Sequence, residues 1–336
     1  MAENAVAEFA RIRTADQRPE LWRVQLQNTM ERDLVRWLTQ RIPSHPRLLV
    51  GVGDDAAIVR LPDESHLVAT TDMLMDGVDF ELNRHEAQRI GRKALAVNLS
   101  DLAAMAAEPV AALVALALPR QGGESLAKSL YEGLLPLAAE FDCPIAGGDT
   151  NSWDGPLVIS VTAFGAVPPE RRWRRSGARP GDAILVTGSF GGSILGKQFD
   201  FRPRVSEALW LADNAEIHAA IDVSDGLSLD LWRLCEASGC GAAVRTSTIP
   251  IAKAAGELAA QRGGSPLDHA LGDGEDFELI LAVPAEVATA LVRSQPLGVP
   301  LTEIGSFIAE PELIAFAPDL SMQPLPVRGY EHRLDS

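Results

Sequence analysis

Short apolar runs separated by turn residues recur along most of the chain, a pattern typical of strands buried in a sheet. Three longer segments, 89–107, 123–141 and 227–237, are rich in apolar residues and predict helices, the last of them capped by Gly239. The alternation of strands and helices predicts an α/β protein. The expected strands cover 48–52, 57–61, 67–71, 110–118, 157–167, 183–187, 219–223 and 279–283.

The pattern also divides the chain into parts. Residues 1–29 are polar and without clear periodicity, so we expect a disordered extension there. A helix with an apolar stripe is predicted from Met30 to Ile42, before Pro43. Near residue 170 the composition changes to Arg, Pro and Gly, which marks a domain boundary. We therefore expect an N-terminal domain over 30–169 and a C-terminal domain over 170–336.

Composition excludes several classes of protein. The 336 residues include 30 Lys and Arg against 46 Asp and Glu, for a net charge of −16. This charge argues against nonspecific binding of nucleic acids or anionic membranes. The longest uninterrupted apolar run, 110–118, is too short to cross a membrane. Three Cys are too few for a disulfide framework, so we expect a reducing compartment, the cytoplasm.

Many of the acidic residues recur in one local sequence arrangement, which indicates that part of the negative charge belongs to a functional site. An apolar run is followed by Asp beside Gly or Thr at Asp54–Asp55, Asp72, Asp149 and Asp222–Asp225. We expect each of these strands to end at its Asp, because ligands of open α/β sheets bind at the carboxyl ends of strands. Carboxylates with neighbouring hydroxyls suit Mg²⁺ bound together with substrate phosphates. The arrangement predicts a metal–phosphate site.

Further residues are compatible with such a site, although each also has an ordinary structural explanation. Asp101 lies in an otherwise apolar helix, where a carboxylate is costly unless it is paired or binds a cation. The glycine runs 147–148 and 188–192 could hold phosphate or could be turns. Arg175 could bind phosphate or belong to a basic linker. Glu275 could bind a cationic substrate or end a loop.

Other chemistries lack their motifs. The sequence has no P-loop, no dinucleotide-binding fingerprint, no HExxH, no CxxC and no GxSxG. Covalent catalysis by Ser or Cys is therefore not expected, and we assign no general base.

Seven motifs now occur in a recognisable order between Gly51 and Leu279: GVGDDAA, TTDMLMDGVDF, KALAVNLSDLAAM, GGDT, RSGARPGD, IDVSDG and GEDFEL. In these motifs the chain resembles the thiamine-monophosphate kinases of the AIR synthetase (PurM)-like superfamily. The resemblance implies a two-domain PurM-like fold of mixed sheets flanked by helices, with the N-terminal domains paired in a homodimer and binding metal and ATP. It also implies ATP-dependent phosphorylation of thiamine monophosphate to thiamine diphosphate by direct in-line transfer, assisted by several Mg²⁺ ions.

The resemblance also assigns roles to residues. Asp79 stands where many members have His, and an anion there could contact phosphate only through a metal. The metal ligands implied are Asp55, Thr70, Thr71, Asp72, Asp101, Asp149, Asp222 and Asp225. The implied ATP contacts are Gly148, Asp149, Arg175 and Ser224, and the implied substrate contacts are Asp79, Glu275 and Tyr330.

Two alternatives stay open. One is a PurM-like ATP-dependent enzyme with another acceptor, similar to selenophosphate synthetase or AIR synthetase. The former carries a reactive Cys or Sec near its N-terminus, whereas the first Cys here is Cys143. The other is a protein that binds Mg·ATP without turnover, for which the loss of several of these Asp would be expected.

Overall fold

The computed structural model describes residues 40, 45–51, 53–61, 66–168, 171, 173–317 and 321–332. The extension predicted for 1–29 lies outside these residues, as does almost all of the helix predicted from Met30 to Ile42. Within the described residues, no helix combines the length and the apolar character that crossing a membrane requires.

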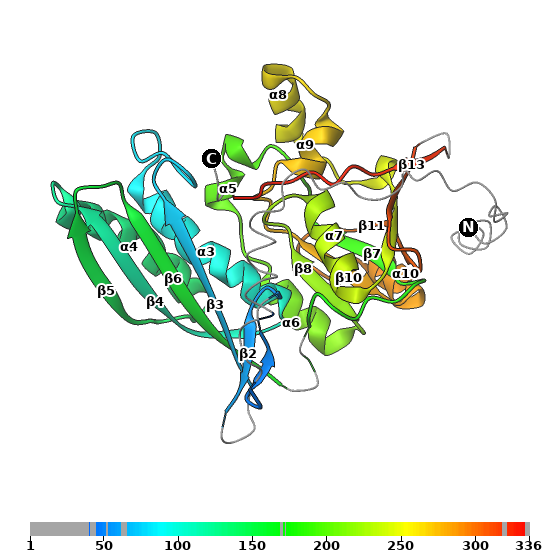
Figure 1. Cartoon of the computed structure of the whole chain (residues 1–336), viewed down its shortest axis with the longest axis horizontal. Coiled ribbons are helices and arrows are strands. Elements are labelled where there is room, and N and C mark those ends of the chain that lie inside the picture. Colours follow the sequence, from blue (N-terminus) through cyan, green and yellow to red (C-terminus); the bar gives the residue numbers. More distant parts are fainter. Residues whose placement is uncertain are drawn as a thin grey trace.

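The first half of the chain builds a six-stranded sheet with two helices against one face (Figure 1). Its strand order is β1-β2-β3-β6-β4-β5, and only β4 and β5 pair in parallel. Side chains along β3 alternate between the helix-covered face, where Leu74 is buried, and the open face, where Met73 is 61% exposed. The strands are β1 (Leu48–Val50), β2 (Ala57–Arg60), β3 (His66–Met75), β4 (Glu108–Pro119), β5 (Ile145–Trp153) and β6 (Val158–Val167), and the helices are α3 (Ala87–Ala104) and α4 (Gly123–Glu140).

The two helices approach each other closely because each has a glycine at the crossing. A Cβ added to Gly91 would lie 2.0 Å from the carbonyl oxygen of Leu130, and one added to Gly133 would lie 1.7 Å from that of Gln88. Only glycine allows backbones to approach this far.

The second half builds a seven-stranded sheet in the order β13-β12-β9-β11-β7-β10-β8, with β9 and β12 parallel and the other pairs antiparallel. Every residue of β7 and β10 is buried, which agrees with sequences that are apolar apart from Thr187 at the end of β7. The strands are β7 (Ala183–Thr187), β8 (Ala219–Asp222), β9 (Gly241–Arg245), β10 (Leu279–Val283), β11 (Leu301–Ile308), β12 (Leu313–Phe316) and β13 (Met322–Pro324). The helices are α5 (Lys197–Asp200), α6 (Val205–Asn214), α7 (Leu227–Ser238), α8 (Lys253–Arg262), α9 (Pro266–Gly272) and α10 (Ala285–Ser294), with short 3₁₀ turns η2 (Ser193–Leu195) and η3 (Thr246–Thr248).

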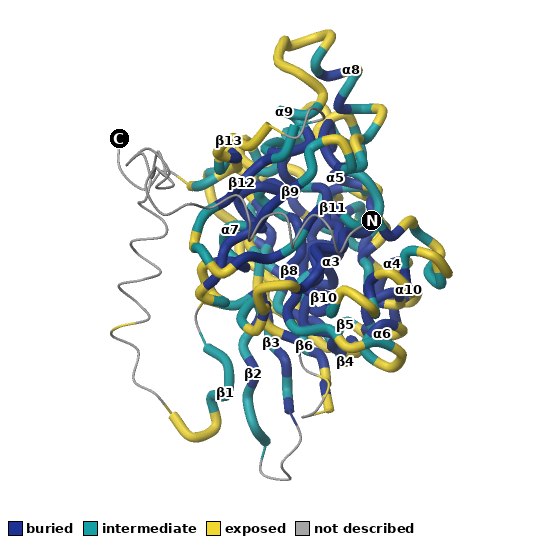
Figure 2. The backbone as a smooth tube through the Cα atoms, turned by 90° about the vertical axis from the view of Figure 1, so that its right-hand side faces the viewer, coloured by how far each residue is buried: buried dark blue, intermediate teal, exposed yellow. Residues whose placement is uncertain are grey.

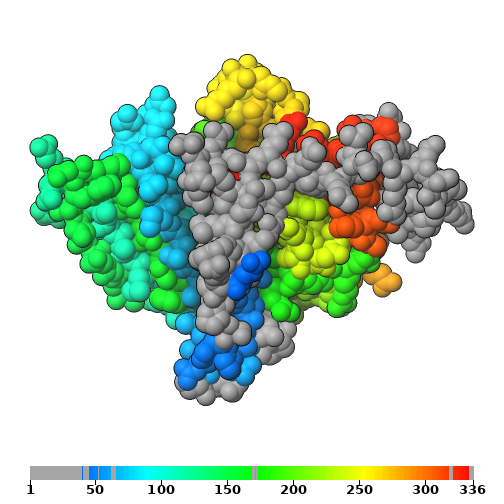
Figure 3. Space-filling model, viewed as in Figure 1, coloured from blue at the N-terminus to red at the C-terminus, as the bar shows by residue number. Residues whose placement is uncertain are grey.

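Helix α3 joins the two halves. It packs on β3 and β6 on one side and on α5, α6 and β8 on the other, so it is buried almost all round (Figure 2). This explains why apolar residues are spread around the helix and why even its polar residues Lys93, Asn98 and Ser100 are buried. One continuous apolar core runs through it and contains residues of both sheets. The two sheets lie to the left and right in Figure 1, and Figure 3 shows the same two parts, cyan and green at the left and lime to red at the right.

These mixed sheets flanked by helices confirm the predicted fold class. The expected strand ends are wrong at two positions, because β3 continues through Asp72 to Met75 and β5 continues through Asp149 to Trp153. Strand β3 pairs with β6 over its whole length, and this pairing carries it past the carboxylate. Asp222 ends β8 as predicted, whereas β1 already ends at Val50, ahead of Asp54 and Asp55.

Candidate functional site

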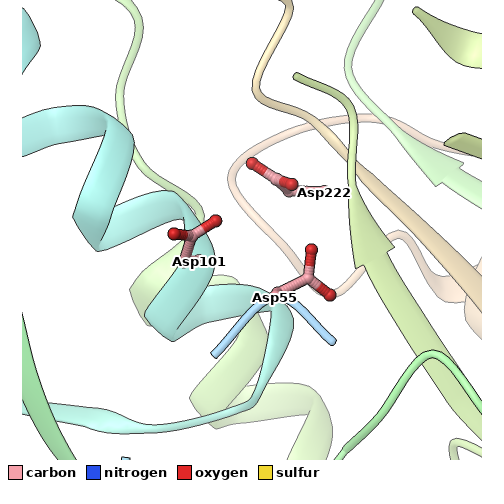
Figure 4. Close-up of side chains that lie close together, drawn as sticks. All are labelled: Asp55, Asp101 and Asp222. Atoms are coloured by element: carbon pink, nitrogen blue, oxygen red, sulfur yellow. The ribbon is translucent and has the colours of Figure 1, made fainter. Parts of the chain in front are cut away.

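Three carboxylates from separate parts of the chain meet where the halves join. Asp55 lies between β1 and β2, Asp101 on α3 and Asp222 at the end of β8. One oxygen from each lies within 4.8 Å of the others, and Figure 4 shows the side chains turned toward one another. The cluster therefore needs both halves, because two of its carboxylates come from the first and one from the second.

Hydroxyl groups hold two of these carboxylates in place. Thr70 Oγ1 donates to the carboxylate of Asp101 and also lies 3.4 Å from the backbone oxygen of Asp55. Ser100 Oγ donates to Asp222 Oδ2 at 2.6 Å, and this bond connects α3 with β8. Hydroxyl groups of the protein thus orient two of the three carboxylates.

Arg175 is the cation that faces this cluster. Its guanidinium donates to Asp55 Oδ1 at 2.8 Å, and its backbone N–H donates to Asp54 Oδ1 at 3.1 Å. The pKa of Arg175 is raised despite burial, because Asp55 favours the charged form. Burial, followed by the charge of Asp55, raises the pKa of Asp54 to about 6.

The carboxylates themselves are strongly perturbed. Burial raises the pKa of Asp101 well above its ordinary value, and the charge of Asp72 adds to the shift. Burial and then the charge of Asp55 do the same to the pKa of Asp222. Burial, with the charges of Asp225 and Asp79, raises the pKa of Asp72 to about 6. Each shift means that the charged form lacks compensation.

The residues fit a divalent cation. Asp55 Oδ2 and Asp72 Oδ2 are buried and have no hydrogen-bond partner among the described residues. A buried carboxylate oxygen without a partner is costly unless a cation or proton compensates it. Mg²⁺ prefers such carboxylate oxygens and commonly shares them with substrate phosphates.

Asp225 has a different environment, because a protein cation already pairs with it. Arg233 donates to the carboxylate of Asp225 and, at 2.8 Å, to Asp230 Oδ1. The backbone N–H of Tyr330 donates to the carbonyl of Asp225 at 3.0 Å, which brings the C-terminal segment to this loop. Asp225 still acts on a neighbour of the cluster, since its charge contributes to the raised pKa of Asp72.

The predicted substrate residues lie beside this loop. The backbone N–H of Glu275 donates to the carbonyl of Ser224 at 2.6 Å, and its carboxylate pairs with Lys93. Burial raises the pKa of Glu275, and Lys93 opposes the shift. Asp79 Oδ2 accepts the backbone N–H of Met75 at 2.7 Å, so this carboxylate stabilises its own turn.

Three predicted residues lie elsewhere, on the open face of the six-stranded sheet or along its edge. Thr71 is exposed, and its hydroxyl lies 3.0 Å from that of Thr162. Asp149 and Gly148 belong to the edge strand β5 and are exposed. Through the strand register Asp149 aligns with Met73, three strands or about 14 Å away. These residues do not join the cluster within one chain.

The glycine run 188–192 is occupied by protein carboxylates instead of being open to phosphate. The N–H of Gly191 donates to Asp276 at 2.9 and 3.0 Å, and that of Gly192 donates to Asp273 at 2.8 Å. The alternative interpretation of this run as a turn is therefore confirmed.

Sequence reasoning missed four residues near the site: Lys93, Ser100, Asp230 and Arg233. Lys93 and Ser100 lie seven positions apart on α3 and are buried. The signal was the same as for Asp101, a polar residue within an apolar helix. Asp230 and Arg233 are three positions apart on α7 and so share one of its faces, and the backbone N–H groups of Asp225 and Gly226 donate to Asp230 Oδ2 at 2.9 and 3.0 Å.

We expect the metal-free protein to become more stable as the pH falls from about 8 to about 5. The pKa of Asp72 is raised from 3.8 to about 6 and that of Asp230 to about 7, so the native state holds protons that the unfolded state has lost. Stability therefore rises as the pH falls through these values, and a pKa difference of one corresponds to about 1.4 kcal/mol. Urea unfolding in EDTA measures this dependence.

Asp72→Asn serves as the control, and its dependence on pH should be flatter than that of the wild type. A wild-type free energy of unfolding that decreases steadily with acid over this range would contradict the assignment.

Comparisons with known proteins extend the geometric picture. Residues 53–167 match the family described as AIR synthase related protein, N-terminal domain, and residues 179–317 match its C-terminal domain. A thiamine-monophosphate kinase of Rhodopirellula baltica is 46% identical over 286 residues, covering 83% of this chain and 90% of the relative.

Solved structures agree. AaThiL complexed with AMPPCP and TMP is similar with a TM-score of 0.79 at 25% identity, covering 93% of this chain and 100% of that one. A thiamine-monophosphate kinase of Stenotrophomonas maltophilia has a TM-score of 0.67 at 35% identity, covering 84% and 94% of the two chains.

Proposed function

The chain belongs to the thiamine-monophosphate kinase family, and on that premise we propose that it transfers the γ-phosphoryl group of ATP to thiamine monophosphate to give thiamine diphosphate. The observation that carries the proposal is the cluster of Asp55, Asp101 and Asp222 at the junction of the halves. A reaction between two phosphorylated anions needs concentrated positive charge, and a cluster of carboxylates can collect it by binding divalent cations.

The donor side of the site is built from the cluster and Arg175. Asp55, Thr70, Asp72, Asp101 and Asp222 would hold Mg²⁺, which when bound supplies the positive charge that screens the phosphates of both substrates. Arg175 keeps a buried Nε without a partner among the described residues, so it has a donor left for a phosphate oxygen. Ser224, in the adjacent loop, faces the same nucleotide in this proposal.

The acceptor side is built from Glu275, Tyr330 and Asp79. Tyr330 is 50% exposed, and its ring can cover a flat heterocycle. A carboxylate and an aromatic ring suit the cationic thiazolium of the acceptor. Asp79 adds negative charge, so we propose that it meets the acceptor phosphate only through a metal.

No general base is required. The attacking group is a phosphate oxygen, and a phosphate monoester has a second pKa of about 6, so the oxygen is largely ionised at neutral pH. Positioning and electrostatic stabilisation can then supply the catalysis.

A homodimer completes the proposal. The open face of the six-stranded sheet exposes apolar side chains, with Met73 61%, Val110 47% and Leu113 38% exposed. Strand β5 is an uncovered edge of that sheet. Exposed apolar faces and open edges of this kind mark interaction surfaces. A second copy on this face would bring Asp149, with Gly148, to the partner's nucleotide site, as Asp149 cannot reach the cluster of its own chain.

We also propose that the enzyme acts in the cytoplasm. All three cysteines are free and buried, which suits a reducing compartment.

The first test is coupled ATP turnover with Mg²⁺ and a panel of acceptors. We expect product with thiamine monophosphate and none with thiamine, selenide or an aminoimidazole ribonucleotide precursor. Thiamine lacks the acceptor phosphate, so it is the matched control. Turnover with another acceptor alone would establish a different enzyme of the superfamily, and ATP binding without turnover on any acceptor would establish a non-catalytic protein.

A further inference from the structure

Lys93 is a charged side chain with no exposed surface, located on the helix that joins the two halves. Its ammonium group donates to the carbonyl of Asp79 at 2.9 Å, to Gln198 Oε1 at 2.9 Å and to the carboxylate of Glu275. All three of its donors are therefore used. The three acceptors come from three segments, one of the first half and two of the second.

Two of these acceptors belong to the proposed acceptor subsite. Asp79 lies in the turn that follows β3, and Glu275 lies in the loop that precedes β10. The two segments come from different halves, and Lys93 is bonded to both. Its position thus sets the distance between the two sides of the subsite.

Holding the halves together does not require this lysine. Arg89 pairs with Asp200, and Arg92 donates to the carbonyls of Phe199 and Phe201 at 2.8 and 2.6 Å. Both arginines lie on α3 and bind the segment 199–201 of the second half, next to Gln198. A buried ammonium is costly, and an apolar residue of similar size would often be as stable. The presence of Lys93 is therefore better explained by a role other than holding the two halves together.

The loop that carries Glu275 is held in an uncommon conformation. Glu275 has φ of 55° and Phe277 has φ of 50°, values that side-chain-bearing residues seldom adopt. Phe277 stacks on Phe201 with ring centroids 4.1 Å apart. Such backbone geometry persists where the surroundings fix it, and it is commonly found at binding sites.

We infer that Lys93 is a positioning residue, which aligns the Glu275 carboxylate with the turn at Asp79 and thereby forms the subsite for the cationic acceptor. This inference rests on the proposed function. Lys93 has no exposed surface, so it acts through Glu275 and not by touching substrate.

Lys93→Met tests the inference by steady-state kinetics with each substrate varied in turn. We expect the KM for thiamine monophosphate to rise about tenfold or more, equivalent to about 1.4 kcal/mol, with the KM for ATP within about twofold of wild type. Glu275→Gln should raise the same KM. The KM of the double variant for thiamine monophosphate should be no higher than that of the more impaired single variant, because both substitutions remove the same interaction, the pairing of Lys93 with Glu275.

Arg89→Met is the matched control, since it removes an ion pair between the same helix and the same segment without touching Glu275. We expect both of its KM values to stay at the wild-type level. If Lys93→Met does not fold, Gln198→Met decides, because it leaves Lys93 paired with Glu275 but less tightly fixed. It should raise the KM for thiamine monophosphate about threefold and leave that for ATP unchanged.

The outcomes separate the two proposals. A wild-type enzyme that uses thiamine monophosphate, with Lys93→Met unchanged in KM or altered equally for both substrates, would overturn the positioning role alone. Additive effects in the double variant would do the same. A wild-type protein that does not use thiamine monophosphate would overturn both.

Discussion

Asp101→Asn should lower kcat by about 10³-fold or more and leave the metal-free protein at least as stable as the wild type. Asp101 is one of three carboxylates that converge within 4.8 Å, and it is held by Thr70 alone among the described side chains. Burial and its acidic neighbours raise its pKa, so the charge is a cost to the empty site. Asn removes that charge and keeps the shape, but it is a much weaker ligand for Mg²⁺.

Activity and melting temperature, each with and without Mg²⁺, measure this effect. The wild type should be stabilised by Mg²⁺ because the ion binds only the folded protein, and the variant should lose most of that shift. Asp200→Asn is the control, since it removes the same charge from an exposed ion pair with Arg89. A large fall in the melting temperature of metal-free Asp101→Asn would instead show a structural role.

Asp55 is a less informative position for this experiment, although it belongs to the same cluster. Its carboxylate pairs with Arg175. Substitution there would leave a buried guanidinium without its main partner, and breaking a buried ion pair is strongly destabilising. Loss of activity could then follow from loss of structure.

The sequence indicated which residues belong to the site better than it indicated how they are arranged. Asp101 was recognisable because a carboxylate in an apolar helix needs compensation, and Asp222 because its strand ends there. Asp72 and Asp149 were expected at strand ends but lie within β3 and β5. An alternating strand can carry a polar residue on either face, and the length of its pairing partner is not encoded locally.

The contacts between segments that are distant in the sequence could not be predicted. Lys93 and Glu275 are 182 positions apart, and nothing in local spacing connects them. The same holds for Ser100 and Asp222, whose hydrogen bond exists only because α3 lies between the two sheets. The residues 188–192 could equally have been a phosphate loop until the positions of Asp273 and Asp276 were known. Such pairings follow from the topology of the fold, which depends on the whole sequence and not on any local segment of it.

Asp149 can reach a nucleotide only from outside the cluster of its own chain. Asp149 lies three strands from β3 and on the opposite face from Asp72, so we expect it to serve the site of a second copy across the open face of the sheet. Asp149→Asn should therefore be nearly inactive as a homodimer, as should Asp101→Asn.

A heterodimer of these two inactive variants, isolated with two different affinity tags, distinguishes the possibilities. If Asp149 acts across the interface, one of its two sites carries both substitutions and the other carries neither, so half of the wild-type activity returns. If Asp149 acts within its own chain, each site carries one substitution and the heterodimer stays inactive. Sedimentation of the wild type as a monomer under assay conditions would also contradict the shared site. Recovery of activity from two inactive chains can arise only when each chain supplies what the other lacks.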